Sequence, residues 1–175
     1  MNAFVDRIIR AAKHDVNLYE EVEADKSALG QAMTVVIISS VAAGLGMISQ
    51  GGLGGIFMGT VAALLGWYIW AFLTYFIGTK FLPEPQTKAD YGELLRTIGF
   101  SSAPGLIRVL GIIPVLGGII FFVASIWMLV AMVIAVRQAL DYSGTLRAVG
   151  VCAIGWVIQV ALMGLVLSFM GAFGG

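Results

Sequence analysis

Long apolar stretches without charge constrain this chain more than any other feature. From Leu29 to Thr79 no residue is charged, and a helix needs only about 20 apolar residues to cross a hydrocarbon core of about 30 Å. Charged residues make up 11% of the chain, whereas a soluble domain carries about 25%. A globule of 18.5 kDa has too little interior to hide so much apolar surface. The sequence therefore predicts an all-α integral membrane bundle.

Five transmembrane helices are predicted, at about residues 28–49, 53–81, 97–110, 112–136 and 148–170. The fourth has Pro114 in its first turn, where a missing N–H costs little. The third is the ambiguous one, because its fourteen residues reach only about 21 Å as an α-helix. We expect it to be either a short span bent at Pro104 or a re-entrant hairpin.

The placement of basic residues favours five crossings. With a cytoplasmic N-terminus and the C-terminus outside, nine of the ten Lys and Arg residues lie on the cytoplasmic side, as the positive-inside tendency expects. The hairpin alternative would place Arg137 and Arg147 outside. The sequence thus predicts a multi-pass protein of the plasma or inner membrane.

Residues 1–27 are expected to form a cytoplasmic segment ahead of a membrane domain that covers residues 28–175. An amphipathic helix is predicted within residues 1–25, because apolar side chains recur at spacings of three and four. They are Val5, Ile9, Ala12, Val16 and Tyr19. Such a helix either lies along the cytoplasmic headgroups or packs against the end of the bundle. Arg7 and Arg10 interrupt the apolar core that a signal peptide would need.

A row of small residues marks the start of the second predicted span. Gly51, Gly55, Gly59 and Ala63 recur every four residues, and small residues let helix backbones approach closely in a membrane. This row, called the small-residue stripe below, is expected to mediate helix packing inside the bundle or the formation of a homodimer.

Arg108 is the one charged residue that the sequence places at membrane depth. An arginine at mid-membrane costs roughly 2.5–3.5 kcal/mol on insertion scales, so such residues usually face a partner or water. Two hypotheses are open: a structural contact near the outer end of the third helix, or a functional site. In the functional version Arg108 binds a lipid phosphate or another anion and is oriented by Ser101 and Ser102.

The sequence lacks the motifs of enzymes and of nucleic-acid-binding proteins. HExxH, a Walker loop and CxxC are absent, and each would carry a recognisable chemistry. The single cysteine, Cys152, provides no disulfide framework and no thiolate cluster. No Asp or Glu lies inside a predicted span, although proton-coupled transporters generally use one. We therefore expect a non-enzymatic protein without catalytic residues, cofactor or metal.

One segment resembles a known family. Tyr91 and Gly92 are followed by the run Gly99, Phe100, Ser101, Ser102, Ala103 and Pro104. This pattern resembles the YG…GYSLIP core of the Yip (Ypt/Rab-interacting protein) membrane family, with Phe100 in place of the tyrosine and Pro104 matching. The run LYEEVEAD at residues 18–25 is similar to the short prokaryotic members.

The resemblance implies a fold of five spans behind a cytoplasmic N-terminal segment, with the motif in the third span. Eukaryotic relatives associate with Rab GTPases through longer N-terminal regions. The DLYGP-type motif of those regions is absent from this sequence, which argues against GTPase binding here.

Two functional hypotheses follow. The first is a membrane scaffold that organises the bilayer or recruits partners, which are the lipid bilayer, a second copy of the chain or other membrane proteins. The second is a transporter, channel or lipid-moving protein that uses the broken third helix and Arg108, since irregular backbone at depth is tolerated where it lines protein or a watery cavity.

Overall fold

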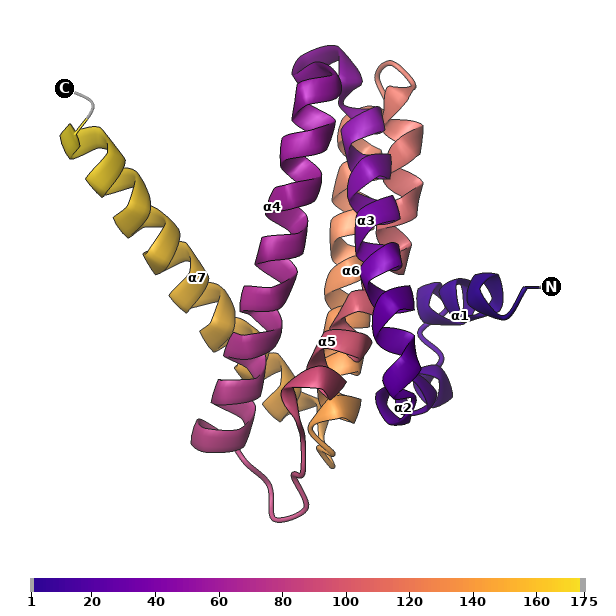
Figure 1. The fold of residues 1–175 in the computed structure, drawn as a ribbon, viewed down its shortest axis with the longest axis vertical. Coiled ribbons are helices and arrows are strands. Elements are labelled where there is room, and N and C mark those ends of the chain that lie inside the picture. The colour runs from indigo at the N-terminus through magenta and orange to yellow at the C-terminus, as the bar shows by residue number, and fades with distance from the viewer. Residues whose placement is uncertain (1, 174–175) are drawn as a thin grey trace.

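The structure is a computed structural model, which describes the backbone of residues 2–173 and the side chains of residues 2–161. Every regular element in this range is a helix, so the all-helical prediction is confirmed for it. Three long helices and one broken helix stand roughly along a common direction, the last long helix leans away from them, and two short helices lie at their side (Figure 1).

The N-terminal segment forms two helices where the sequence predicts one. Helix α1 spans Ala3–Ala12 and α2 spans Val16–Ala24. The chain breaks between them because His14 takes a left-handed conformation at φ 60° and the side chain of Asp15 accepts a hydrogen bond from the amide of Asn17. An aspartate in this position caps the start of a new helix.

The next two helices form a long antiparallel pair. A short 3₁₀ turn, η1 (Lys26–Ala28), leads into α3 (Leu29–Gly46). After a tight turn at Met47, α4 runs from Ile48 to Phe76 and continues as a π-helix, η2 (Ile77–Phe81). Helix α4 thus starts five residues before the predicted span, and its first turns are kinked where Gly52 takes φ 56°, a conformation that glycine adopts without steric cost.

The third predicted span is a helix in two parts. Helix α5 spans Tyr91–Phe100, and the 3₁₀-helix η3 follows over Ala103–Ile112. Pro104 explains the break, because its ring clashes with the carbonyl four residues earlier and prevents the α-helix from continuing beyond Phe100. A 3₁₀-helix rises about 2.0 Å per residue, so the segment is longer than the predicted 21 Å.

Two long helices complete the chain. Helix α6 spans Gly117–Ala139, and α7 spans Thr145–Phe173. The sequence predicts Pro114 in the first turn of this helix. In the structure Pro114 lies in the connection before α6. The predicted span 148–170 falls within α7. Side chains after Ala161 lie outside the described residues, as do residues 174 and 175 at the end of the predicted membrane domain.

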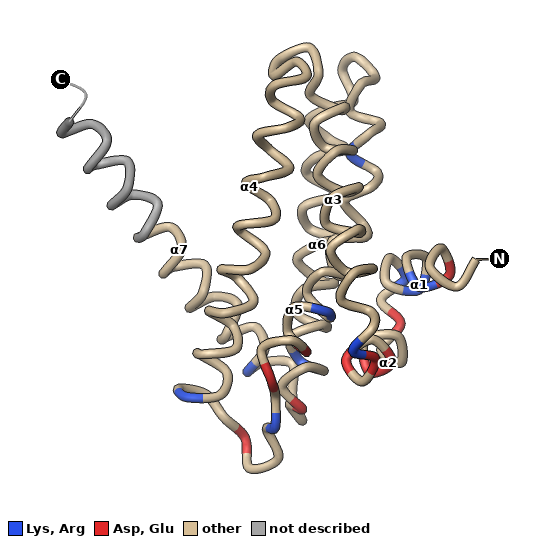
Figure 2. Tube along the Cα trace, viewed as in Figure 1, with Lys and Arg blue, Asp and Glu red and all other residues tan. Residues whose placement is uncertain are grey.

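The segments alternate in direction. The connections from η2 to α5 and from α6 to α7 lie at one end of the bundle, and those from α3 to α4 and from η3 to α6 lie at the other (Figure 1). Three segments are long and apolar enough to span a membrane within the described residues: Lys26–Gly46, Ile48–Phe81 and Gly117–Ala139. Charged positions gather at the first of the two ends and on α1 and α2 (Figure 2). We call the end that holds the η2–α5 and α6–α7 connections the charged end.

Candidate functional site

The residues of the family-like motif anchor and break the third segment. Asp90 and Glu93 form a capping box at the start of α5, and the Tyr91 hydroxyl donates to the carbonyl of Tyr68 on α4 at 2.9 Å. Gly92 lies beside this cap, where an added Cβ would sit 3.0 Å from an Asp90 side-chain oxygen. The motif therefore fixes where the segment enters the bundle.

The second half of the motif sets how closely this segment packs against α3. A Cβ on Gly99 would lie 2.7 Å from that of Ala32, and a Cβ on Gly105 would lie 2.2 Å from Ser39 Oγ. Further along, a Cβ on Gly46 would lie 2.1 Å from the Arg108 carbonyl. Phe100, Ser101 and Pro104 are buried. Close approach through small residues, predicted for the small-residue stripe, is thus made by Gly99, Gly105 and Gly46.

The contacts also explain how a short segment reaches the far end of α3. The chain from Gly99 to Arg108 runs beside the chain from Ala32 to Gly46, which is about 21 Å of α-helix. A plain α-helix from Gly99 to Arg108 would rise only about 14 Å. The greater rise of the 3₁₀ conformation over residues 103–108 supplies about 3 Å of the difference. Arg108 is consequently carried to the end of the bundle opposite the charged end.

Two adjacent cavities lie between α3, α4 and η3, and both have Ser40, Ala63 and Arg108 in their walls. The cavity nearer the α3–α4 turn, called the upper cavity, has a volume of about 490 Å³ and is also lined by Gln50, Gly51, Gly55 and Gly59. The lower cavity, of about 270 Å³, is also lined by Ser102, Trp67, Met128, Met132 and Gln159. We call the two cavities together the Arg108 groove.

The small-residue stripe lines the Arg108 groove, and its three glycines make no close contact with the described residues of other helices. A Cβ added to Gly51, Gly55 or Gly59 would meet no heavy atom within 4 Å. The described residues thus show no helix packed on these three glycines, and the packing or homodimer role of the stripe stays a prediction. The stripe leaves space where larger side chains would close the groove.

Arg108 has little inside the protein to balance its charge. Its Nη2 donates to Ser125 Oγ on α6 at 3.0 Å, and its guanidinium carbon lies 5.6 Å from the centre of the Phe121 ring. Its Nε is buried without a hydrogen-bond partner. Among residues 2–161, none of the ion pairs includes Arg108.

The structure separates the two serines that the sequence groups with Arg108. Ser102 lines the lower cavity together with Arg108, but the hydroxyl of Ser101 is buried and donates to the carbonyl of Ile98. Ser125, the actual side-chain partner, was missed. It is the only hydroxyl residue between residues 115 and 136, which is the signal that could have found it.

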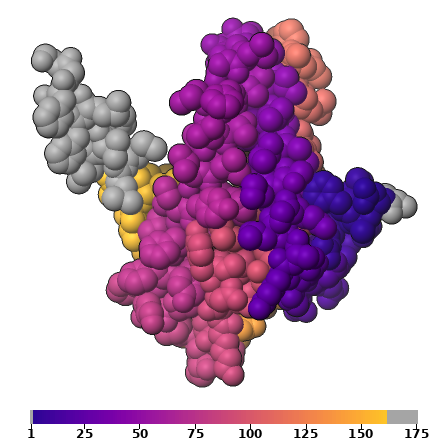
Figure 3. Space-filling view, in the orientation of Figure 1, coloured from indigo at the N-terminus to yellow at the C-terminus, as the bar shows by residue number. Residues whose placement is uncertain are grey.

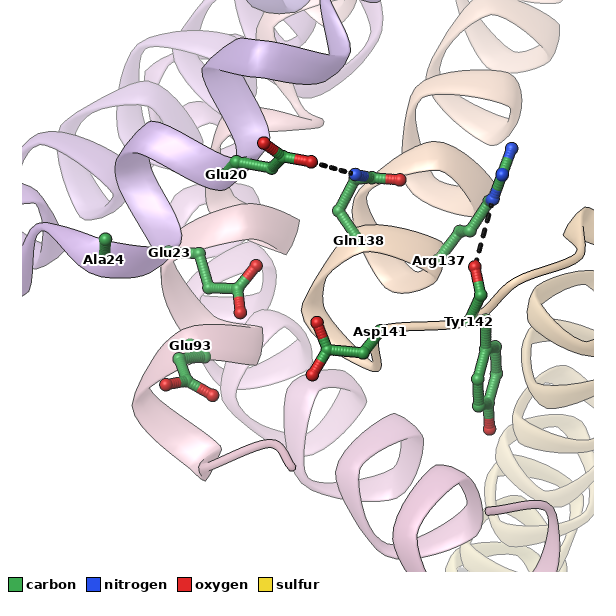
Figure 4. A pocket seen from close by; sticks show the side chains of 8 residues that line it. All are labelled: Glu20, Glu23, Ala24, Glu93, Arg137, Gln138, Asp141 and Tyr142. Atoms are coloured by element: carbon green, nitrogen blue, oxygen red, sulfur yellow. Dashed lines mark hydrogen bonds between the residues drawn. The ribbon is translucent and has the colours of Figure 1, made fainter. Parts of the chain in front are cut away.

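A separate cavity lies at the charged end and is lined mostly by acidic side chains (Figure 4). This cavity, of about 330 Å³, lies where α2, α5 and the end of α6 meet, and it is called the acidic cavity below. Its charged lining residues are Glu20, Glu23, Glu93, Asp141 and Arg137. In Figure 4 the carboxylates of Glu23 and Asp141 face a common space, and Glu20 accepts a hydrogen bond from Gln138.

Glu23 is the carboxylate with the most altered acidity in this cavity. Burial raises its pKa to about 7, and the negative charges of Glu93, Asp141 and Glu20 add to the effect, while Arg96 opposes it. A neutral carboxyl is favoured where other carboxylates surround it and water is partly excluded. Glu23 consequently changes charge near neutral pH.

Within the described residues no three Asp, Glu, His or Cys side chains are arranged to hold a metal ion.

Arg96 ties α2 to α5 beside the acidic cavity. The sequence places it in a cytoplasmic loop, but its side chain is only 5% exposed. Its Nε donates to the carbonyl of Val22 at 2.9 Å, and its Nη2 donates to the carbonyl of Glu23. These are carbonyls of the last turn of α2, which carry the partial negative charge of the helix C-terminus.

Helix α1 is held against α2 and α6. Arg7 and Arg10 pair with Glu21 at 2.9 and 2.6 Å, and Arg7 also pairs with Asp25 at 2.9 Å. On the other side, the indole of Trp127 donates to the carbonyl of Ala12 at 2.8 Å. In the space-filling view the N-terminal residues protrude from the side of the bundle (Figure 3).

The side of α1 that faces neither α2 nor the bundle is apolar. Val5 and Ile9 are 42% and 37% exposed. With 3.6 residues per turn, they project from the opposite side of the helix to Arg7 and Arg10. Of the five apolar residues predicted to line the N-terminal amphipathic helix, Tyr19 is buried, Ala12 is half-buried, and Val16 is exposed like Val5 and Ile9.

Comparison with known proteins gives one match. The family model of the Yip1 domain matches residues 15–174. Neither the curated proteins nor the solved structures that were compared give a match.

Proposed function

This chain belongs to the Yip family of Yip1-domain membrane proteins, and on that premise we propose that it is a non-enzymatic membrane scaffold that organises the bilayer or recruits partners to it. The family is generally non-enzymatic. Residues 2–161 contain no cluster that could hold a metal ion, and the free Cys152 is buried.

The proposed topology has five crossings, with the charged end in the cytoplasm and the C-terminus outside. The alternating directions of α3, α4, the α5–η3 segment, α6 and α7 support it (Figure 1). Single cysteines at Gln86, Ser143 and Gly175 in a Cys152→Ala background test it with an impermeant thiol reagent on intact cells. Labelling at Gly175 alone is expected. Labelling at Ser143 without Gly175 would favour the re-entrant hairpin.

One observation carries the scaffold proposal: the exposed apolar side of α1. Helix α2 lies between α1 and the charged end (Figure 1), and Arg7 and Arg10 point from α1 toward α2. Val5 and Ile9 therefore face away from the charged end, toward the depth at which the bundle meets hydrocarbon. An amphipathic helix in this orientation buries its apolar side about 5–10 Å into the headgroup boundary.

The fixed position of α1 gives this insertion a mechanical consequence. Because Trp127 and the ion pairs with α2 hold α1 to the bundle, its apolar side cannot leave the bilayer without breaking those contacts. A shallow helix that occupies only one leaflet spreads the headgroups of that leaflet. The protein would thus act on membrane shape without chemistry.

Vesicle deformation tests this proposal. Reconstituted wild-type protein is expected to narrow or tubulate liposomes, as seen by electron cryomicroscopy, and Ile9→Asp is expected to abolish the effect because a charge is expelled from hydrocarbon. Asn17→Asp adds the same charge at another exposed position and should leave the deformation unchanged. Equal deformation by the wild type and Ile9→Asp would refute the role of α1.

The Arg108 groove favours a second candidate function, the movement of a lipid or an anion. A groove that holds a cation, hydroxyls and a glutamine beside apolar helices resembles the lining of a permeation path. This candidate predicts that Arg108→Ala abolishes flux in proteoliposomes. Flux that the mutation does not change would remove its support.

A further inference from the structure

The Arg108 groove holds a positive charge that no anion among the described residues balances. Arg108 is the only charged residue between residues 97 and 136, and no Asp or Glu lies between residues 29 and 79. Its one side-chain partner is the neutral hydroxyl of Ser125. A partly buried guanidinium without a counter-charge is unfavourable, and the Nε of Arg108 is buried without a partner, so an anion from outside the chain would stabilise this site.

The groove has the shape and the donors for a phosphate with a hydrocarbon tail. A guanidinium presents five N–H donors in a planar fork that matches phosphate oxygens, and only Nη2 of Arg108 is engaged by a side chain. Gln50 lies in the same upper cavity, toward the α3–α4 turn. Beyond Arg108, the glycines of the small-residue stripe and the apolar Met128, Met132 and Trp67 leave a path of low polarity.

We propose that the Arg108 groove binds a phospholipid, with the headgroup phosphate on Arg108 and an acyl chain along the small-residue stripe. The leaflet concerned is the one at the α3–α4 turn, opposite the charged end. The upper cavity, of about 490 Å³, lies within the roughly 300–1,000 Å³ of ordinary ligand sites. Binding needs neither membrane deformation nor flux, so the inference is independent of the scaffold role.

The position of Ser125 supports a built site on α6. Ser125 lies one turn before Met128 and two turns before Met132, which places it on the side of α6 that faces the groove. Its hydroxyl donates to the carbonyl of Phe121 at 2.7 Å, which leaves its lone pairs free to accept from Arg108. Ser125 therefore orients the guanidinium without neutralising it.

Native mass spectrometry of the full chain tests the proposal. The protein is released from nanodiscs that contain phosphatidylglycerol, and the bound phospholipid is counted at rising lipid concentration. Arg108→Gln is expected to weaken binding at least about tenfold, because it removes a charge-assisted pair. Arg147→Gln, which removes a cation at the charged end, should bind as the wild type does. Equal binding by the wild type and Arg108→Gln overturns the proposal.

A second pair of variants keeps the test valid if Arg108→Gln fails to fold. Gly55→Leu fills the groove without touching Arg108, whereas Gly54→Leu adds the same side chain next to it, outside the lining of the groove. A Cβ at either glycine meets no atom within 4 Å, so both variants should fold. We expect weaker phospholipid binding only for Gly55→Leu. Equal losses in both variants would contradict a site in the groove.

Two other occupants are outcomes of the same experiment. Competition by inorganic phosphate at the level of the phospholipid, with no gain from the acyl chain, would show a free-anion site and overturn the lipid assignment. A dimer that Gly55→Leu dissociates, with unchanged phospholipid binding, would show that a second copy fills the groove.

Discussion

The arginines near the charged end and the arginine of the Arg108 groove differ in the partners that they contact. Beside the charged end, Arg7 and Arg10 on α1 pair with carboxylates, and Arg96 donates to carbonyls of α2. In the groove, Arg108 has a single hydroxyl and an aromatic ring. The arginines near the charged end thus have acceptors within the described residues, whereas Arg108 has no anionic partner there.

Packing differs in the same way. Beside the break in the third segment, glycines bring α3 within contact distance of Gly99 and Gly105. On α4, the glycines of the small-residue stripe face open space. Small residues thus serve close packing in one region and an open groove in the other, and their spacing alone does not distinguish the two uses.

The largest effect is expected from Arg96→Met, which breaks the charged end. This change leaves the carbonyls of Val22 and Glu23 without their donor and should destabilise the docking of α2 by about 3 kcal/mol. Hydrogen exchange of the α2 amides measures that opening free energy. Lys88→Met is the control, because it removes an exposed cation. Unchanged protection of α2 would show that Arg96 does not hold it.

A pair of glycine substitutions sharpens the packing contrast. Gly105→Ala places a Cβ against Ser39 Oγ and near Met128, and overpacking of this kind costs about 1–3 kcal/mol. Gly59→Ala adds a Cβ in open space on α4 and should be neutral or stabilising by up to about 1 kcal/mol. Denaturant titration in detergent compares the two. Equal destabilisation would contradict the open groove.

Much of the fold follows from the sequence because its causes are local. The length of the uncharged runs predicts α3, α4 and α6, and Pro104 predicts the break in the third segment. The start of α5 was missed, although the capping box of Asp90 and Glu93 is a local signal for it. The split between α1 and α2 depends on the left-handed His14, which the apolar spacing does not reveal.

The site was predicted only in part because its contacts join distant segments. Arg108 stands out as a lone charge at depth, but its pairing with Ser125 depends on how η3 lies against α6. Arg96 looks like a loop residue because the carbonyls that bury it belong to α2, more than seventy residues earlier. Hydropathy cannot show such contacts.

A smaller effect is expected from pH at the charged end. Because the folded protein holds the pKa of Glu23 at about 7, above the usual 4.5, it binds a proton that the unfolded chain releases. The contribution of Glu23 to stability is therefore fully present below about pH 4.5 and is lost as pH rises through about 7. Partial exposure limits the loss to about 1 kcal/mol.

The variant Glu23→Gln tests the origin of this pH dependence. It should remove the fall in α2 protection between about pH 5 and 8, since Glu20, Glu93, Asp141, Arg137 and Arg96 remain around a neutral side chain. Glu84→Gln is the control, because Glu84 lies outside the acidic cavity. A pH dependence that persists in Glu23→Gln would assign it to another carboxylate.

The smallest effect is expected for the ion pair between Arg147 and Glu84. Their side chains approach to 3.3 Å, but the Arg147 side chain is 49% exposed, and exposed pairs contribute about 0–1 kcal/mol. Arg147→Gln should change the unfolding free energy by less than about 0.5 kcal/mol, and added salt should hide even that. Measuring Arg96→Met in the same detergent distinguishes two roles that a basic residue at the charged end can have. A buried guanidinium on helix carbonyls holds the structure, whereas an exposed pair only places positive charge beside the membrane. A loss for Arg147→Gln as large as that for Arg96→Met would mean that the connection between α6 and α7 stabilises the charged end as strongly as α2 does.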